Sequence, residues 1–152
     1  MKIYLDVSCL NRPFDDQEQA RIRLEAAAVG MIFERFDEGA WTQVSSEMAT
    51  IEIDASPDLK RRARVRLLLP DLEHIVKLTP AVFARGAELQ KLGLKAADAV
   101  HVAAAEKAEA DVLLTCDDRL LRVAQRHAGK LGLPVRNPMN WLEEVEHATD
   151  AS

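Results

Sequence analysis

Cysteine is scarce in this chain: its 152 residues include two, Cys9 and Cys116. Two thiols are too few for the disulfide framework of a small secreted protein, and their separation matches no metal-binding spacing. We therefore expect reduced thiols. A redox pair would form only if the strands that precede the two cysteines are neighbours, and no C-x-x-C motif supports one.

Long apolar runs and an excess of positive charge are also absent. No uninterrupted apolar stretch approaches membrane-spanning length, and Asp6 lies where a signal peptide needs its apolar core. We expect a soluble, cytoplasmic protein that is not attached to a membrane. The net charge of -5 and pI near 5.4 argue against a protein that coats nucleic acid through bulk charge, although a local basic face remains an option.

The sequence contains no internal repeat, low-complexity tract or linker. With 48% hydrophobic residues, 152 residues suffice for one core, which predicts a single domain over 1–152. Strand patterns alternate with helix patterns, which indicates an α/β fold: a three-layer α/β/α sandwich with a mostly parallel central sheet. The expected strands are 2–7, 41–44, 74–78, 111–115 and 134–136. The expected helices are 17–38, one that carries Met48 and Glu52, 58–69, 81–92, 96–110, 118–128 and 139–147, and a loop is expected at 8–13.

Four acids interrupt otherwise apolar segments, and they are Asp6, Glu52, Asp98 and Asp117. Asp6 and Asp117 follow strands, at the end of a parallel sheet where ligands bind. Asp98 interrupts an alanine-rich helix. Carboxylates packed together repel one another unless they are protonated or neutralised by a hard cation, so the four predict a divalent metal site.

Three of the four acids also have an ordinary structural interpretation. Asp6 would begin a loop, and Asp117 would cap the next helix. Asp98 would pair with His101, which lies three residues on, and that histidine would then support the site rather than bind the metal.

Glu47 and Glu52 compete for the second position. Five residues separate them, so they point about 140° apart around a helix and both can hardly face one site. Glu47 falls in the first turn, where it complements the helix dipole, whereas Glu52 lies deeper between two isoleucines. We favour Glu52, with Glu47 as the alternative.

These motifs together resemble the PIN-domain ribonucleases. The resemblance is carried by Tyr4-Leu5-Asp6 with Val7-Ser8, by Ser46 six residues before Glu52, by Ala97-Asp98-Ala99-Val100-His101 and the alanines after it, by Leu114-Thr115-Cys116-Asp117, and by the closing Val135-Arg136-Asn137-Pro138. It spans nearly the whole chain. It implies that Asp6, Glu52, Asp98 and Asp117 converge on Mg²⁺ or Mn²⁺, with Asn11 and Asp118 as supporting polar groups.

The resemblance also implies an activity and partners. PIN-domain proteins of this kind cut RNA, and many small bacterial ones are toxins held in check by a cognate antitoxin, as in VapBC pairs. We expect a metal-dependent endoribonuclease in which one or two metal ions activate a water. No covalent nucleophile is needed, so Ser8 and Thr115 are expected to hydrogen-bond a carboxylate or loop. The sequence does not fix the oligomeric state, and a homodimer is one option.

Other functions fit less well. A phosphatase of the haloacid dehalogenase type needs a second Asp where this chain has Ser8, and a phospho-receiver domain needs an Asp at the end of its third strand, which here reads Val76-Lys77-Leu78. The alternative that is not an enzyme is a catalytically silent PIN-like module that binds RNA or a protein. The presence of all four acids argues against it.

RNA needs a basic surface on this acidic protein. Residues 60–66 carry five positive charges in seven positions and are the first candidate for phosphate contacts, with a solvated helix face or a docking strip for an acidic antitoxin segment as alternatives. A second, weaker basic set follows Asp117 and consists of Arg119, Arg122, Arg126 and Lys130.

Overall fold

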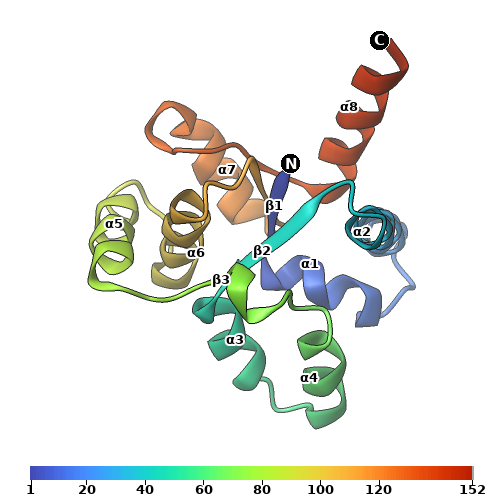
Figure 1. Cartoon of the computed structure of the whole chain (residues 1–152), viewed down its shortest axis with the longest axis horizontal. Coiled ribbons are helices and arrows are strands. Elements are labelled where there is room, and N and C mark those ends of the chain that lie inside the picture. Colours follow the sequence, from blue (N-terminus) through green and yellow to red (C-terminus); the bar gives the residue numbers. More distant parts are fainter. Residues whose placement is uncertain (152) are drawn as a thin grey trace.

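The computed structural model describes residues 1–151 as strands alternating with helices (Figure 1). The strands are β1 Lys2–Leu5, β2 Thr42–Ser46, β3 Ile75–Val76, β4 Val112–Leu114 and β5 Val135–Arg136. The helices are α1 Val7–Asn11, α2 Ala20–Asp37, α3 Glu47–Asp54, α4 Leu59–Arg66, α5 Pro80–Gln90, α6 Ala96–Lys107, α7 Asp118–Arg126 and α8 Pro138–Ala151. Short 3-10 helices are η1 Arg12–Phe14, η2 Leu72–His74 and η3 Ala128–Lys130.

The five strands form one sheet in the order β3-β2-β1-β4-β5. Every pairing is parallel, which agrees with the predicted sheet. In the central pairs, Tyr4 lies opposite Val44 of β2 and Leu113 of β4. Strand β1 is therefore at the middle of the sheet, and the residues that follow β1 and β4 emerge side by side at its carboxyl edge.

Alternating side chains of β1 build two cores, because successive residues of a strand point to opposite faces. Ile3 and Leu5 pack with α1, α2 and α8, while Tyr4 packs with α5 and α6. Figure 1 shows these two groups of helices on either side of the sheet. The predicted three-layer sandwich is confirmed.

Small side chains allow α5 and α6 to pack closely. Ala99, Ala103 and Ala104 of the alanine-rich helix are buried, and Gly86 of α5 lies against Val100. A β-carbon added at Gly86 would already be in van der Waals contact with Val100. The alanines therefore pack in the interior rather than project into solvent.

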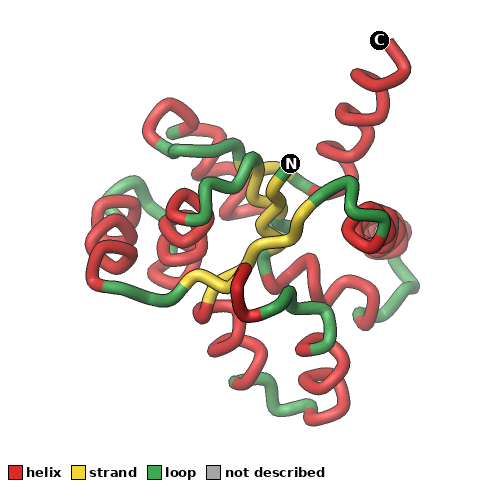
Figure 2. Tube along the Cα trace, viewed as in Figure 1, coloured by secondary structure: helices red, strands yellow, loops and turns green. Residues whose placement is uncertain are grey.

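Two local predictions were wrong. The predicted loop at 8–13 is instead α1 followed by η1 (Figure 2), because the Asp6 carboxylate caps α1 and Pro13 lies at the start of η1, where no backbone donor is needed. Asp98 is not in the middle of its helix but in the first turn of α6. None of the helices within the described residues is long and apolar enough to cross a membrane.

Candidate metal and nuclease site

The four predicted acids belong to four different helices. Asp6 caps α1 directly after β1, Asp117 caps α7 after β4, Asp98 lies in the first turn of α6, and Glu52 lies on α3. Because β1 and β4 are adjacent and parallel, their carboxyl ends bring Asp6 and Asp117 to one edge of the sheet.

Asp6 is held rigidly by three donors. Its Oδ1 accepts the Val7 backbone N–H at 2.8 Å, and its Oδ2 accepts the hydroxyls of Ser8 at 2.9 Å and Thr115 at 2.7 Å. Thr115 in turn accepts the backbone N–H of Asp117 at 3.1 Å. The two hydroxyls thus donate hydrogen bonds to a carboxylate, as expected, and connect the ends of β1 and β4.

Glu52 is oriented by a buried chain of hydrogen bonds. Its Oε1 contacts Nε2 of His101, whose Nδ1 lies 2.6 Å from the hydroxyl of Tyr4. The Tyr4 hydroxyl also lies 2.7 Å from Oγ of Ser46, the N-cap of α3. His101 Nε2 is 3.7 Å from Oδ1 of Asp6. The predicted supporting histidine is therefore in place, but it hydrogen-bonds Tyr4 and Glu52 rather than Asp98.

Burial and charge have opposite effects on the pKa of His101. Burial alone would lower the pKa of the His101 imidazole, but the hydrogen bond to Glu52 and the nearby acids raise that pKa above its ordinary value. Burial raises the pKa of the Tyr4 phenol, so its hydroxyl remains protonated.

The pKa of Asp98 depends on its burial and on the charges of the other acids. Burial, followed by the negative charges of Asp6 and Asp117, raises its pKa from 3.8 to about 6. Glu52 adds to this rise, and His101 opposes it. Asp98 makes no hydrogen bond to any described residue that would stabilise its charge. The four carboxyl groups therefore share one electrostatic environment.

Asp117 divides its carboxylate between two roles. Its Oδ1 accepts the backbone N–H groups of Arg119 at 2.8 Å and Leu120 at 3.2 Å, which is the expected helix cap. Its Oδ2 has no hydrogen-bond partner among the described residues. Capping and facing a cation are therefore compatible for this side chain.

Glu47 and Glu52 face different neighbours. Glu47 accepts the backbone N–H of Leu78 at 2.7 Å and so anchors the segment that follows β3. Glu52 instead contacts His101 beside Asp6. The geometry places Glu52 nearer the other acids and gives Glu47 a structural contact.

The donor set fits a hard divalent cation, since it consists of carboxylate oxygens. Burial and, after it, the charges of Asp6 and Asp117 raise the pKa of Asp98, and a bound cation would favour its charged form. Within the described residues, no three His, Cys, Asp or Glu side chains already lie in the arrangement of a metal site. That Asp6, Glu52, Asp98 and Asp117 hold the ion stays a prediction.

A family profile decides what this fold is. The profile of the PIN domain matches residues 3–126. The chain belongs to the PIN-domain family. PIN domains are generally metal-dependent nucleases.

One solved structure that resembles this PIN domain is VapBC2 from Rickettsia felis bound to a DNA fragment from their promoter. The similarity covers 90% of this chain and 98% of that chain, with a TM-score of 0.52 and 14% sequence identity. At this identity, the resemblance shows a shared fold. No curated protein sequence matches the chain.

Glu25 is a buried charge that the sequence analysis missed. Its carboxylate is 0% exposed and contacts Arg12 at 2.9 Å, Arg21 at 3.3 Å and the side-chain amide of Asn137 at 2.6 Å. The signal was available in the helical spacing, because Glu25 lies four residues before Val29 and on the same apolar stripe of α2.

The two predicted supporting groups contact arginines. Asn11 donates to the carbonyl of Val7 at 3.1 Å, and its side-chain oxygen lies 3.4 Å from Arg61. Asp118 accepts two hydrogen bonds of 2.8 Å from Arg21. Asn11 therefore connects α1 to α4, and Asp118 connects α7 to α2.

The basic segment 60–66 is largely committed to the fold. Arg61 pairs with Asp15 at 2.6 Å, Arg62 donates to the carbonyl of Ser56 at 3.1 Å, and Arg66 pairs with Asp54. Of the second basic set, Arg119, Arg122 and Arg126 are exposed on α7 and make no side-chain hydrogen bond in the described part of the chain, although the charge of Arg122 helps to lower the pKa of Asp118. The second set is therefore the freer surface.

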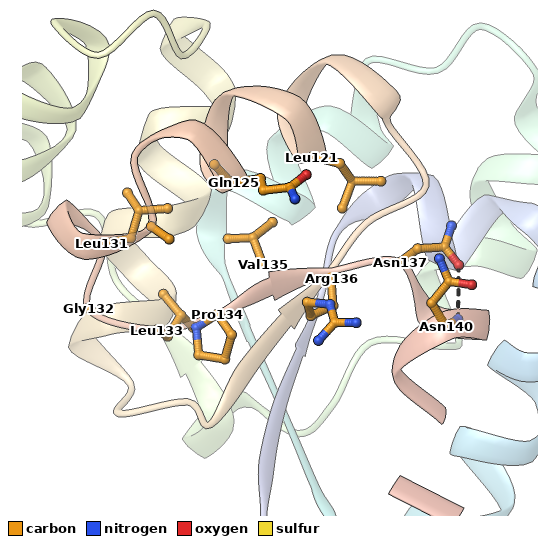
Figure 3. A pocket seen from close by; sticks show the side chains of 12 residues that line it. Leu121, Gln125, Leu131, Gly132, Leu133, Pro134, Val135, Arg136, Asn137 and Asn140 are labelled. Atoms are coloured by element: carbon orange, nitrogen blue, oxygen red, sulfur yellow. Dashed lines mark hydrogen bonds between the residues drawn. The ribbon is translucent and has the colours of Figure 1, made fainter. Parts of the chain in front are cut away.

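Two further features, a pair of cysteines and a pocket, are not part of the group of four acids. The thiols of Cys9 and Cys116 are free and buried, with their sulfurs 3.8 Å apart, because β1 and β4 are neighbours. A pocket of about 750 Å³ lies between α7, β5 and the start of α8 (Figure 3). None of the four acids lines that pocket, so it is separate from the candidate site.

Proposed function

We propose that this PIN domain is a Mg²⁺- or Mn²⁺-dependent endoribonuclease and the toxin of a toxin–antitoxin pair. The observation that carries the proposal is geometric: Asp6 and Asp117 follow the adjacent parallel strands β1 and β4, and His101 contacts Glu52 while lying 3.7 Å from Asp6. The raised pKa of Asp98, caused by burial and then by the charges of Asp6 and Asp117, agrees with this arrangement. A divalent cation bound there would lower the pKa of a water and neutralise charge as the phosphodiester bond breaks.

The residues of the chain have separable tasks in this reaction. Ser8 and Thr115 hold Asp6 in one orientation, and His101 holds Glu52 beside it. Both hydroxyls donate to a carboxylate, and no imidazole base contacts them among the described residues. Attack on phosphorus by Ser8 or Thr115 is therefore disfavoured, which leaves hydrolysis by water.

The exposed face of α7 supports RNA as the substrate. Arg119, Arg122 and Arg126 recur at a spacing that places them along one side of the helix, which begins beside Asp117. A backbone phosphate held there would lie next to the acids. The fold shared with VapBC2 supports an antitoxin as the partner that controls this activity.

Purified protein, free of any partner, tests the proposal. We expect cleavage of single-stranded RNA with Mg²⁺ or Mn²⁺, loss of cleavage with EDTA, and loss with Asp6→Asn or Asp98→Asn at unchanged circular dichroism. Asp58→Asn is the control, since Asp58 also caps a helix, α4. Full activity of both site variants would contradict the metal mechanism. RNA binding without cleavage by wild type would favour the silent module.

A further inference from the structure

The buried carboxylate of Glu25 organises a chain of charges that ends at the candidate site. Charges alternate along this chain in the order Arg61, Asp15, Arg12, Glu25, Arg21 and Asp118. A buried carboxylate is costly unless it is paired and hydrogen-bonded. Here two arginines and Asn137 satisfy it, and Figure 3 shows Asn137 between β5 and the first turn of α8.

Arg21 is the partner of Glu25 that reaches the acid cluster. The two terminal nitrogens of its guanidinium donate hydrogen bonds of 2.8 Å to the Asp118 carboxylate. The group also donates to the backbone carbonyl of Cys116 at 3.2 Å. Its Nε donates to Glu25. Asp117 lies between the two residues that Arg21 holds.

We infer that Arg21 is a positioning residue: anchored by buried Glu25, it fixes the loop on both sides of Asp117 and so aims the free oxygen of that carboxylate at the other acids. The inference rests on the proposed function, because it treats Asp117 as a member of the site. Arg21 acts through the loop and not through contact with RNA.

The contacts favour this role over a purely stabilising ion pair and over direct binding of an RNA phosphate. The Arg21 and Asp118 side chains are 45% and 55% exposed, and exposed ion pairs contribute little to stability. The guanidinium also directs hydrogen bonds to three protein acceptors, so it is not an unpaired cation that waits for a phosphate. Its geometry instead joins a fixed carboxylate on α2 to the start of α7.

Arg21→Gln tests the inference, with Arg85→Gln as the matched control. Arg85 has a similar arrangement away from the acids, with two hydrogen bonds to Glu106, at 2.8 and 3.1 Å, and one to the carbonyl of Lys130 at 2.8 Å. Both variants lose a two-pronged contact to a carboxylate and a contact to a carbonyl. Their difference isolates the effect on Asp117.

The first measurement needs neither metal nor RNA. In EDTA, hydrogen exchange of the backbone amides 116–120 should be faster in Arg21→Gln than in wild type or Arg85→Gln, while the amides of β1 should be unchanged. Equal exchange in all three proteins would overturn the inference. This readout remains decisive even if the wild type cleaves no RNA, an outcome that would end the proposed function instead.

The second measurement uses Mn²⁺ and RNA. In Arg21→Gln, kcat should fall about 10- to 100-fold and the Mn²⁺ concentration for half-maximal thermal stabilisation should rise, as for other residues that orient metal ligands. KM for RNA should stay near the wild-type value. A raised KM with unchanged kcat would make Arg21 an RNA contact and overturn the inference.

Arg21→Lys separates geometry from charge. Lysine keeps the positive charge but lacks the planar, two-pronged donor set that matches a carboxylate. We expect Arg21→Lys to behave like Arg21→Gln. Full recovery of kcat by lysine would show that charge alone suffices, and would contradict a positioning role.

Discussion

The charge of Asp6 acts on Asp98, but the two carboxyl groups differ in their surroundings. Asp6 is fixed by three donors, whereas Asp98 has burial and the field of other acids without a compensating hydrogen bond from any described residue. A polar group without a partner is where a ligand is most needed. At the scale of single residues, Asp98 is therefore the most sensitive reporter of the site.

The two glutamates of α3 provide an internal comparison. Glu52→Gln should lower cleavage by two orders of magnitude or more, because its carboxylate lies beside His101 and Asp6. Glu47→Gln should keep nearly full activity and lose some thermal stability, since it weakens a contact to the Leu78 N–H. Cleavage assays and melting curves of both variants check this. Inactivity of Glu47→Gln alone would reassign the second acid.

The pKa of Asp98 predicts a pH-dependent stability without metal. Its pKa is raised from 3.8 to about 6, so between these values the folded chain binds more protons than the unfolded chain, and stability falls as pH rises. In EDTA at pH 7.5, Asp98→Asn should melt above wild type by about 2–4 °C. At pH 4 the two should melt together. The control is Asp71→Asn, at an exposed acid outside the cluster; a pH-independent difference for Asp98→Asn would contradict the argument.

The charges of the sequence indicated α4 as the first candidate for RNA contacts and α7 as the weaker one, but the contacts in the structure reverse that order. Three arginines of α4 have protein partners: Arg61 pairs with Asp15, Arg62 donates to the Ser56 carbonyl, and Arg66 pairs with Asp54. These contacts fasten α4 to the ends of η1 and α3. The arginines of α7 are exposed on a helix that begins at the site. A run of positive charge identifies a basic segment, but the acids that the fold brings beside it decide whether the charge is free.

Substitutions on the two helices should therefore separate binding from folding. Changing Arg119, Arg122 and Arg126 to Gln should reduce the salt dependence of RNA binding by about 2 in log–log slope, at about 0.7 for each phosphate contact on a single strand. Changing Arg61 and Arg62 to Gln should lower the melting temperature and leave that slope almost unchanged. Filter binding from 50 to 300 mM salt, roughly, measures the slope. The opposite pattern would return the RNA surface to α4.

For the molecule as a whole, the sequence predicted what depends on local pattern. Apolar strands and helix periodicity indicated the alternating α/β order, and spacing separated Glu52 from Glu47. Contacts between distant segments were beyond it: His101 turned toward Tyr4 and Glu52, and the pairing of Glu25 with Arg12 and Asn137. These depend on which element packs beside which, and hydrophobic periodicity does not encode that information.

Metal binding by four acids from separate elements would be a property of the whole folded molecule. A cation that binds the folded chain and not the unfolded chain stabilises it by mass action, by about 2.7 kcal/mol at one hundred times the dissociation constant. Millimolar Mn²⁺ should therefore raise the melting temperature of wild type. The double variant Asp6→Asn, Asp98→Asn should show almost no shift, whereas the control Asp58→Asn, at the cap of α4, should shift like wild type. If the double variant responds as strongly as wild type, Mn²⁺ binds elsewhere, and the four acids would then be better explained as helix caps and hydrogen-bond partners of His101 and Thr115.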